Sequence, residues 1–276
     1  MLLTTSAVGW GGVMAGVVLV TGASAGIGLA CADRLAASGW TVVGGSRRGT
    51  GSGAWQSVPL DVDDDASVPR VVDDVATTHG RIDAVVLAAG WGVAGPVEMT
   101  PIAEAKAQLE TNFWGVVRVV QAVLPLMRGQ GGGRIVVMSS IGGVIGIPFQ
   151  AFYSASKFAL EGYAEALAYE VAPFGIGVTL VEPGNFKTDF TASRRKLTDL
   201  GPYDAATAKA VTLMERDEHN GADPALVARA VERVLTSRRA PRRISVGKAG
   251  ERAGIVAKRL LPYRWFEKAA SGALGV

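Results

Sequence analysis

Tyr153 and Lys157, four residues apart, are the two side chains whose types and spacing point most directly to chemistry. The flanking sequence is typical of a helix, on which positions i and i+4 share one face. A free tyrosine has a pKa of about 10, and a nearby ammonium group lowers it by favouring the phenolate. The pair can therefore donate and accept a proton near neutral pH. The alternative is an exposed pair on an amphipathic helix, and the motif by itself favours that alternative.

Alternating strands and helices would position this pair. Apolar runs predict strands at 17–21, 41–46, 58–62, 83–90, 134–140, 176–182 and 242–247. Helical periodicity predicts helices at 29–37, 66–78, 101–127, 151–172, 205–218 and 224–237. Fully apolar strands are typical of a parallel sheet covered on both faces. We therefore predict one α/β domain, a Rossmann-like doubly wound parallel sheet of about seven strands with helices on both faces.

A glycine-rich segment follows the first predicted strand and contains Gly22, Gly26 and Gly28. A strand, a glycine loop and a helix in this order can hold a pyrophosphate on backbone amides at the helix N-terminus. Gly22 and Gly26 would let the backbone approach the phosphates, and Gly28 would let helix and strand pack closely. The spacing is Gly-x3-Gly-x-Gly rather than Gly-x-Gly-x-x-Gly, so a plain glycine-rich turn is an equal alternative.

The second predicted strand ends in Ser46, Arg47 and Arg48, with no acidic residue. In an NAD site an acid at this point bonds the ribose 2′-hydroxyl, whereas a guanidinium suits the 2′-phosphate of NADP. The pattern favours NADP, and two solvated arginines are the alternative. Asp61, after the third predicted strand, could bond the adenine amino group or serve in a helix cap or turn.

Ser140 ends the fifth predicted strand, thirteen residues before Tyr153. Active sites of open α/β sheets lie at the carboxyl ends of the strands, so we expect Ser140 and Tyr153 to meet there. Asn112 lies inside the long helix predicted at 101–127. Its amide would need partners if buried, and it is either a structural residue or part of a site. The polar segment from 185 to about 202 lacks a clear period and begins a lid expected over 185–218.

Cys31 is the single cysteine among 276 residues, which excludes an internal disulfide and fits a reducing compartment, so we expect a cytoplasmic protein. Cys31 lies in a predicted helix, where a buried structural thiol is expected. With only two histidines the chain is not expected to bind a metal. No segment reaches the roughly 20 uninterrupted apolar residues that spanning a bilayer requires.

Both ends of the chain differ from the middle in composition or charge. Residues 1–16 are apolar and carry no Lys or Arg, so we expect an N-terminal extension, with Met14 as an alternative start. Residues 229–268 hold twelve Lys or Arg against three acids, 12 − 3 = +9, and the remainder balances to 16 − 22 = −6. This basic segment could attract an acidic carrier or a membrane surface, although a solvated helix face is the favoured alternative. Leu260 and Trp265 in the basic tail 248–276 could pack on a neighbouring subunit, and no nucleic-acid partner is expected.

Taken together, these motifs resemble the short-chain dehydrogenase/reductase family from residue 17 to about residue 247. The resemblance rests on an ordered set of positions: Thr21-Gly22-x3-Gly26-Ile27-Gly28, Asp61, Ala89-Gly90, Asn112, Ser140, Tyr153-x3-Lys157 and Pro183-Gly184 with Thr188. Segments 140–149 and 153–162 are similar to the branch that contains 17β-hydroxysteroid and retinol dehydrogenases. The resemblance implies an NADP(H)-dependent oxidoreductase that interconverts a secondary alcohol and a ketone or aldehyde, with NAD(H) as the second candidate cofactor.

The resemblance also implies roles for individual residues. Tyr153 is the general acid for carbonyl reduction and the base for alcohol oxidation, and Lys157 lowers its pKa and binds the nicotinamide ribose. Ser140 orients the carbonyl, and Asn112 holds a water in a proton relay. The residues expected to contact the cofactor are Gly22, Ser24, Ala25, Gly26, Ile27, Gly28, Ser46, Arg47, Arg48, Asp61, Val62, Ala88, Ala89, Gly90, Tyr153, Lys157, Pro183, Gly184, Phe186 and Thr188.

Two departures from the family pattern concern the cofactor site. The usual Asn-Asn-Ala-Gly is Leu87-Ala88-Ala89-Gly90 here, and Ala25 stands where many NADP-preferring members carry a basic residue. The lost asparagine removes side-chain hydrogen bonds, and the NADP preference rests on Arg47 and Arg48 alone.

The substrate is expected to be apolar, such as a steroid, a retinoid or a fatty chain. The residues expected beside it are Trp91, Ser140, Val144, Phe149, Tyr153 and Phe186. Family members are commonly homodimers or homotetramers built on the helices that contain Asn112 and Tyr153. The alternative function is a catalytically weak NADP(H)-binding regulatory protein, against which the four intact catalytic positions argue.

Overall fold

The first strand shows why this sequence forms a sheet covered on both faces. In the computed structural model, which describes residues 16–274, all five residues of β1 (Val17–Thr21) are buried. Val17 and Leu19 pack into the core on one face, and Val18 and Val20 pack into the core on the other. A strand that must be apolar on both sides reads as a continuous hydrophobic run, which is what its sequence contains.

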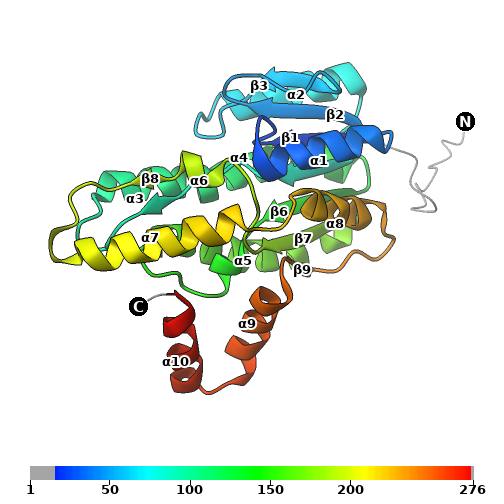
Figure 1. Ribbon diagram of the computed structural model, residues 1–276. Helices are drawn as coiled ribbons and strands as arrows, with labels where there is room; N and C mark the ends of the chain where they lie inside the picture. Colours follow the sequence, from blue (N-terminus) through cyan, green and yellow to red (C-terminus); the bar gives the residue numbers. More distant parts are fainter. Residues whose placement is uncertain (1–15, 275–276) are drawn as a thin grey trace, which may run out of the picture.

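Seven parallel strands form the central sheet, which confirms the predicted fold class (Figure 1). Their order is β3-β2-β1-β4-β6-β7-β9. Chain order runs outward in one direction from β1 and in the other from β4, so the switch point of the topology lies between these two strands. Ligands bind at such a point, outside the carboxyl ends of the strands. The other bounds are β2 (Thr41–Ser46), β3 (Gln56–Pro59), β4 (Ala84–Leu87), β6 (Gly133–Met138), β7 (Ile176–Pro183) and β9 (Arg243–Val246).

Two layers of helices enclose this sheet (Figure 1). One face is covered by α1 (Gly26–Ala37) and α8 (Ala225–Thr236), and the other by α2 (Ser67–His79), α4 (Gly115–Gly129) and α5 (Ala151–Val171). Elements outside these layers surround the carboxyl edge of the sheet or extend from it. Their bounds are β5 (Val93–Ala94), α3 (Ile102–Leu109), α6 (Phe190–Ser193), β8 (Arg195–Lys196), α7 (Asp204–His219), α9 (Ala249–Leu260) and α10 (Tyr263–Leu274).

The helix predicted at 101–127 begins one residue later and contains an irregular turn. A π-helical turn, Glu110–Trp114, separates α3 from α4. Such a turn inserts an extra residue into a helix and often marks a functional site. Here it contains Asn112, which is fully buried.

The third predicted strand was placed too late in the chain. It ends at Pro59, and a turn at residues 62 and 63 follows shortly after it. The Asp61 carboxylate accepts the backbone N–H of Asp63 at 3.1 Å, which is the local bond that favours a turn. Residues 185–202 are also more ordered than expected, because α6 and β8 lie within them.

The tail predicted at 248–276 forms the helical hairpin α9–α10, which projects from the body of the molecule (Figure 1). Between residues 16 and 274 the model contains no helix that is both long and apolar enough to cross a bilayer. The N-terminal extension predicted over 1–16 lies almost wholly outside the described residues.

Candidate active site

The glycine segment forms a tight turn between β1 and α1. Gly22 and Gly26 have φ values of +69° and +55°, which favour glycine. A Cβ added at Gly28 would lie 2.2 Å from the carbonyl oxygen of Gly22, so only glycine fits there. The first turn of α1 contains no acidic residue. Free backbone amides at a helix N-terminus with no competing carboxylate fit a pyrophosphate group.

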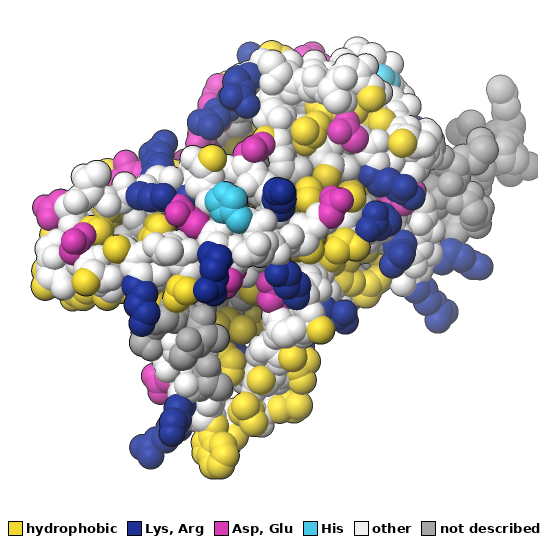
Figure 2. Space-filling model, viewed as in Figure 1, with side chains coloured by type: hydrophobic (Ala, Val, Ile, Leu, Met, Phe, Trp, Pro, Cys, Tyr) yellow, Lys and Arg dark blue, Asp and Glu magenta, His cyan; other side chains and the backbone are white. Residues whose placement is uncertain are grey.

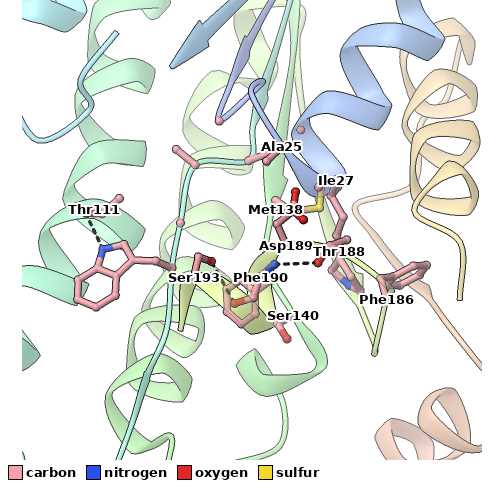
Figure 3. A pocket seen from close by; sticks show the side chains of 18 of the residues that line it. Ala25, Ile27, Thr111, Met138, Ser140, Phe186, Thr188, Asp189, Phe190 and Ser193 are labelled. Atoms are coloured by element: carbon pink, nitrogen blue, oxygen red, sulfur yellow. Dashed lines mark hydrogen bonds between the residues drawn. The ribbon is translucent and has the colours of Figure 1, made fainter. Parts of the chain in front are cut away.

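A cavity of about 660 Å³ lies at the carboxyl edge of the sheet, beside this turn (Figure 3). Every residue that the sequence predicted for cofactor contact lines it, from Gly22 in the first loop to Thr188 after β7. A dinucleotide fits this cavity, because the glycine turn lies at one side of it and Tyr153 and Lys157 line it too. Cofactor contact at each residue stays a prediction.

The loop after β4 shows how the chain compensates for the missing asparagine. The Thr21 hydroxyl accepts the backbone N–H groups of Ala88 and Ala89, at 3.1 and 3.2 Å. A Cβ on Gly22 would lie 2.8 Å from Ala89, so the two loops touch. The buried Thr21 side chain thus holds the loop without an amide side chain in it.

Ser140 and Tyr153 meet at the end of β6, as the spacing predicted. The Ser140 hydroxyl accepts the backbone N–H of Gly142 at 3.0 Å, and both this hydroxyl and the Tyr153 ring lie next to Gly142. Burial raises the pKa of Tyr153, and this outweighs the lowering by the Ser140 hydrogen bond and by the positive charge of Arg194. The phenol is therefore protonated at neutral pH.

Lys157 is buried one turn along α5 from Tyr153 and points toward β6. Its Nζ donates to the carbonyl oxygen of Met138 at 2.8 Å and lies 5.8 Å from the Tyr153 ring centroid. Burial lowers the pKa of Lys157 to about 8, and the nearby Glu161 carboxylate opposes that shift. The expected lowering of the Tyr153 pKa is not found, because desolvation dominates and the Lys157 ammonium is bonded to a carbonyl rather than to the phenol.

Asn112 lies behind the cavity and does not line it. Its side chain accepts the backbone N–H of Trp91 at 3.0 Å and donates to the carbonyl oxygen of Trp91 at 2.9 Å and to Ser156 at 3.1 Å. These three bonds hold the loop after β4 against the helix that carries Tyr153. The role of Asn112 in a proton relay stays a prediction.

Arg47 and Arg48 lie at the end of β2, where both are exposed and line the cavity. Asp63 lines the same end. Burial raises the pKa of Asp63. A hydrogen bond from Thr111 and the positive charge of Arg47 lower that pKa but do not cancel the effect of burial. This end of the cavity therefore presents two guanidinium groups next to backbone amides, which suits an anionic group.

Elsewhere the cavity is lined by both apolar and polar side chains. Trp91 and Phe186 line it as expected, but Val144 and Phe149 do not. The turn after Ser140 directs the Val144 carbonyl to Lys258 on α9, and Phe149 is held in an unusual conformation with φ of +58° while its carbonyl accepts the N–H of Gly95.

Several lining residues were missed by sequence reasoning, and Phe190 is the clearest of them. Its ring centroid lies 5.6 Å from that of Tyr153. Its position two residues after Thr188 was the only signal for it in the sequence. The other missed residues include Ile141, Ile147, Gln150 and Glu218.

The segment predicted as a lid is anchored at several points. Arg195 and Leu197 on and after β8 donate backbone hydrogen bonds to the carbonyl oxygens of Gly92 and Ala94. The buried Arg194 forms an ion pair with Glu218 of α7 and lies over the Phe190 ring at 5.5 Å. The segment covers the reacting end of the cavity, since Phe190 and Glu218 both line it.

Comparisons with known proteins agree with this geometry. The family model described as short chain dehydrogenase matches residues 16–199. The 3-ketodihydrosphingosine reductase of Bacteroides thetaiotaomicron is 41% identical over 235 residues, which are 84% of this chain and 87% of that protein. Human 17-beta-hydroxysteroid dehydrogenase type 1 is 39% identical over 191 residues, 63% of this chain and 58% of that protein, so the match spans little more than half of its length.

A solved structure has a similar fold. A short-chain dehydrogenase from Streptomyces avermitilis superposes with a TM-score of 0.82 at 34% identity, and the match covers 94% of this chain and 98% of that one. The family match extends over two thirds of the chain and includes the glycine turn, Ser140, Tyr153 and Lys157. The chain therefore belongs to the short-chain dehydrogenase/reductase family, whose members are oxidoreductases that act on CH–OH groups with NAD or NADP.

Proposed function

We propose that the protein is an NADPH-dependent reductase that converts a ketone on an apolar, long-chain substrate into a secondary alcohol. The observation that carries the proposal is the placement of Tyr153, which lines the cavity together with Ser140 and Lys157 and lies with its ring 5.6 Å from that of Phe190. A protonated phenol is the form that donates a proton to a carbonyl oxygen. Reduction is the direction that we propose.

The reaction needs a hydride and a proton. NADPH, when bound, supplies the hydride to the carbonyl carbon. Tyr153 gives its phenolic proton to the carbonyl oxygen, and Ser140, which the Gly142 N–H holds in place, donates a hydrogen bond to the same oxygen. Lys157 contributes a positive charge 5.8 Å from the ring as the phenolate forms.

Two arginine side chains support NADPH over NADH as the cofactor. Arg47 and Arg48 follow β2 at the position where an NAD site would carry an acid, and both line the cavity. A guanidinium pairs with a phosphate through charge-assisted, often bidentate, hydrogen bonds. Ala25 offers no further charge, so these two side chains carry the preference.

The substrate class is supported by the lining of the cavity and by the relatives. Ile141, Ile147 and Phe190 surround the Tyr153 side of the cavity, with Trp91 and Phe186 near by. A relative at 41% identity is a 3-ketodihydrosphingosine reductase, whose substrate is a ketone on a long alkyl chain. A ketone on an apolar chain would cover these apolar side chains, whereas a small hydrophilic ketone would leave them in contact with water.

Cofactor choice is tested by fluorescence titration of NADPH and NADH. We expect wild type to prefer NADPH, and Arg47→Ala/Arg48→Ala to weaken NADPH binding roughly 10- to 100-fold while NADH binding changes little, as the loss of charge-assisted bonds predicts. Arg70→Ala/Arg239→Ala, two exposed arginines elsewhere, is the matched control. Equal NADH and NADPH affinities in wild type would remove the cofactor assignment.

Turnover is tested by NADPH oxidation with 3-ketodihydrosphingosine, a 17-ketosteroid and acetone. We expect the long-chain ketone to be reduced fastest and acetone slowest. Tyr153→Phe should lose more than ~100-fold in turnover, the range of general acid catalysis, while binding NADPH normally. If NADPH binds but no ketone is reduced, the alternative of a regulatory NADP(H)-binding protein replaces this proposal.

The proposal includes assembly from identical subunits. Trp114 and Phe158, on the helical segments that contain Asn112 and Tyr153, are 49% and 42% exposed, and burial between copies would remove both from water. Analytical ultracentrifugation should give a dimer or tetramer, and Trp114→Glu should shift it toward the monomer. A wild-type monomer at micromolar concentration would contradict this part.

The cytoplasm is the proposed compartment. The free thiol of Cys31 supports a reducing environment, where a protein gains nothing from disulfide bonds. Fractionation of cells that express the chain tests this placement, and recovery from an oxidising compartment would oppose it.

A further inference from the structure

The α9–α10 hairpin exposes an unusual concentration of apolar side chains. Leu260, Trp265 and Tyr263, exposed by 77%, 73% and 71%, are the three most exposed large apolar side chains among the described residues. Val256 and Leu261 lie beside them and are exposed as well. These five residues, here named the hairpin face, lie on α9, on the turn and on the start of α10.

Basic side chains are interleaved with the hairpin face. Arg252 and Arg259 are exposed on α9, four residues before and three residues after Val256, and Arg264 and Lys268 are exposed on α10. Residues 249–271 carry five Lys or Arg against two Glu, 5 − 2 = +3. Figure 2 shows hydrophobic side chains in yellow along the lower edge of the hairpin, with dark-blue basic side chains beside them.

The opposite side of α9 is fixed to the rim of the active site. Ile255 is buried, and Glu251 accepts the backbone N–H of Asn185 at 3.0 Å, in the loop after β7. Lys258 donates to the carbonyl oxygen of Val144 and lies 5.0 Å from the Phe158 ring centroid. The hairpin is therefore tied to the loops that follow β6 and β7, both of which line the cavity.

We propose that the hairpin face docks on the surface of an anionic lipid bilayer. Leu and Val enter the acyl boundary, Trp and Tyr favour the headgroup level, and Arg and Lys pair with anionic headgroups. A second copy of this chain fits less well, since two identical faces would bring the same positive charges together. Docking would bring the rim of the cavity to the bilayer, where apolar substrates reside, but lipid binding itself does not depend on the proposed function.

Vesicle flotation with the full chain tests this inference, using phosphatidylcholine vesicles with and without 30% phosphatidylglycerol. We expect wild type to float with the anionic vesicles, to stay behind with the zwitterionic ones, and to be released by salt. Arg259→Gln/Arg264→Gln should lower the partition coefficient roughly 30-fold, and Leu260→Ser/Trp265→Ser by roughly tenfold or more. Circular dichroism verifies that each variant is folded, and flotation needs neither cofactor nor substrate.

Matched controls change the same residue types elsewhere on the surface. Arg70→Gln/Arg239→Gln removes the same charge, and Val97→Ser/Leu226→Ser removes exposed apolar side chains from the body. Both should float like wild type. The inference would be overturned if wild type did not float with anionic vesicles, or if the hairpin variants floated as well as the controls. It would also be overturned if a hairpin variant instead converted an oligomer into a monomer.

Discussion

Replacing Arg243 by methionine should destabilise the protein through the two carboxylates that this arginine neutralises. Arg243 on β9 bonds Glu161 of α5 at 2.7 Å and Glu182 of β7 at 2.8 Å. The side chains of Glu182 and Glu161 are 0% and 10% exposed, whereas that of Arg243 is 31% exposed. Breaking a buried pair costs about 3–5 kcal/mol, and the partial exposure of Arg243 places the expected loss near 3 kcal/mol.

The loss should depend on pH. Burial already raises the pKa of Glu161, Glu182 raises it further, and Arg243 opposes both effects. Without Arg243 the folded-state pKa rises again, so the folded protein keeps a proton that the unfolded chain releases near its pKa of about 4.3. Stability then falls as pH rises above that value, and the variant should lose more stability at pH 8 than at pH 5.

Urea unfolding followed by circular dichroism at pH 5 and pH 8 measures both effects. Arg216→Met breaks an exposed pair with Asp217 and should cost less than about 1 kcal/mol. Glu182→Gln/Arg243→Met should recover part of the loss, because one buried charge is removed. The reasoning is refuted if Arg243→Met matches Arg216→Met in stability, or if its loss is the same at both pH values.

Three further outcomes follow from close contacts and burial. Gly28→Ala should weaken NADPH binding more than tenfold, because its Cβ would lie 2.2 Å from the Gly22 carbonyl oxygen. In the same titration Gly129→Ala, whose Cβ would meet open space, should bind NADPH like wild type. Burial raises the pKa of Cys31 to about 12, so this thiol should resist iodoacetamide at pH 9 until the protein is unfolded. Rapid labelling of the folded protein would contradict this. Asn112→Leu should lower stability by about 2 kcal/mol or more in urea unfolding, because backbone groups of the loop after β4 lose their partners; a smaller loss would mean that water replaces the amide.

Local patterns were enough to predict most of the fold and the residues that line the cavity beside the glycine turn. The strands alternate with helices, and the central strands β1 and β4 are apolar and buried along their whole length, so a covered parallel sheet follows from the pattern. The glycine turn and the pair Arg47 and Arg48 stand directly beside the strands that position them. A residue next to a strand end lies at the carboxyl edge of the sheet whatever the rest of the chain does.

The substrate end was predicted less well, because its walls come from segments far apart in sequence. Val144 and Phe149 were expected there, but neither lines the cavity. Phe190 and Glu218 reach the cavity only because α7 and the small sheet of β5 and β8 fold back over it. No periodic pattern marks such contacts.

The sequence by itself determined the family, the topology and the identity of the groups that can do chemistry, because motif spacing and strand periodicity are local properties of the chain. Only the tertiary structure decided how those groups behave. The pKa of Tyr153 is raised rather than lowered because burial of the phenol outweighs nearby positive charge, and Lys157 is bonded to the Met138 carbonyl. Desolvation depends on everything packed around a group, and no spacing of residues along the chain encodes it.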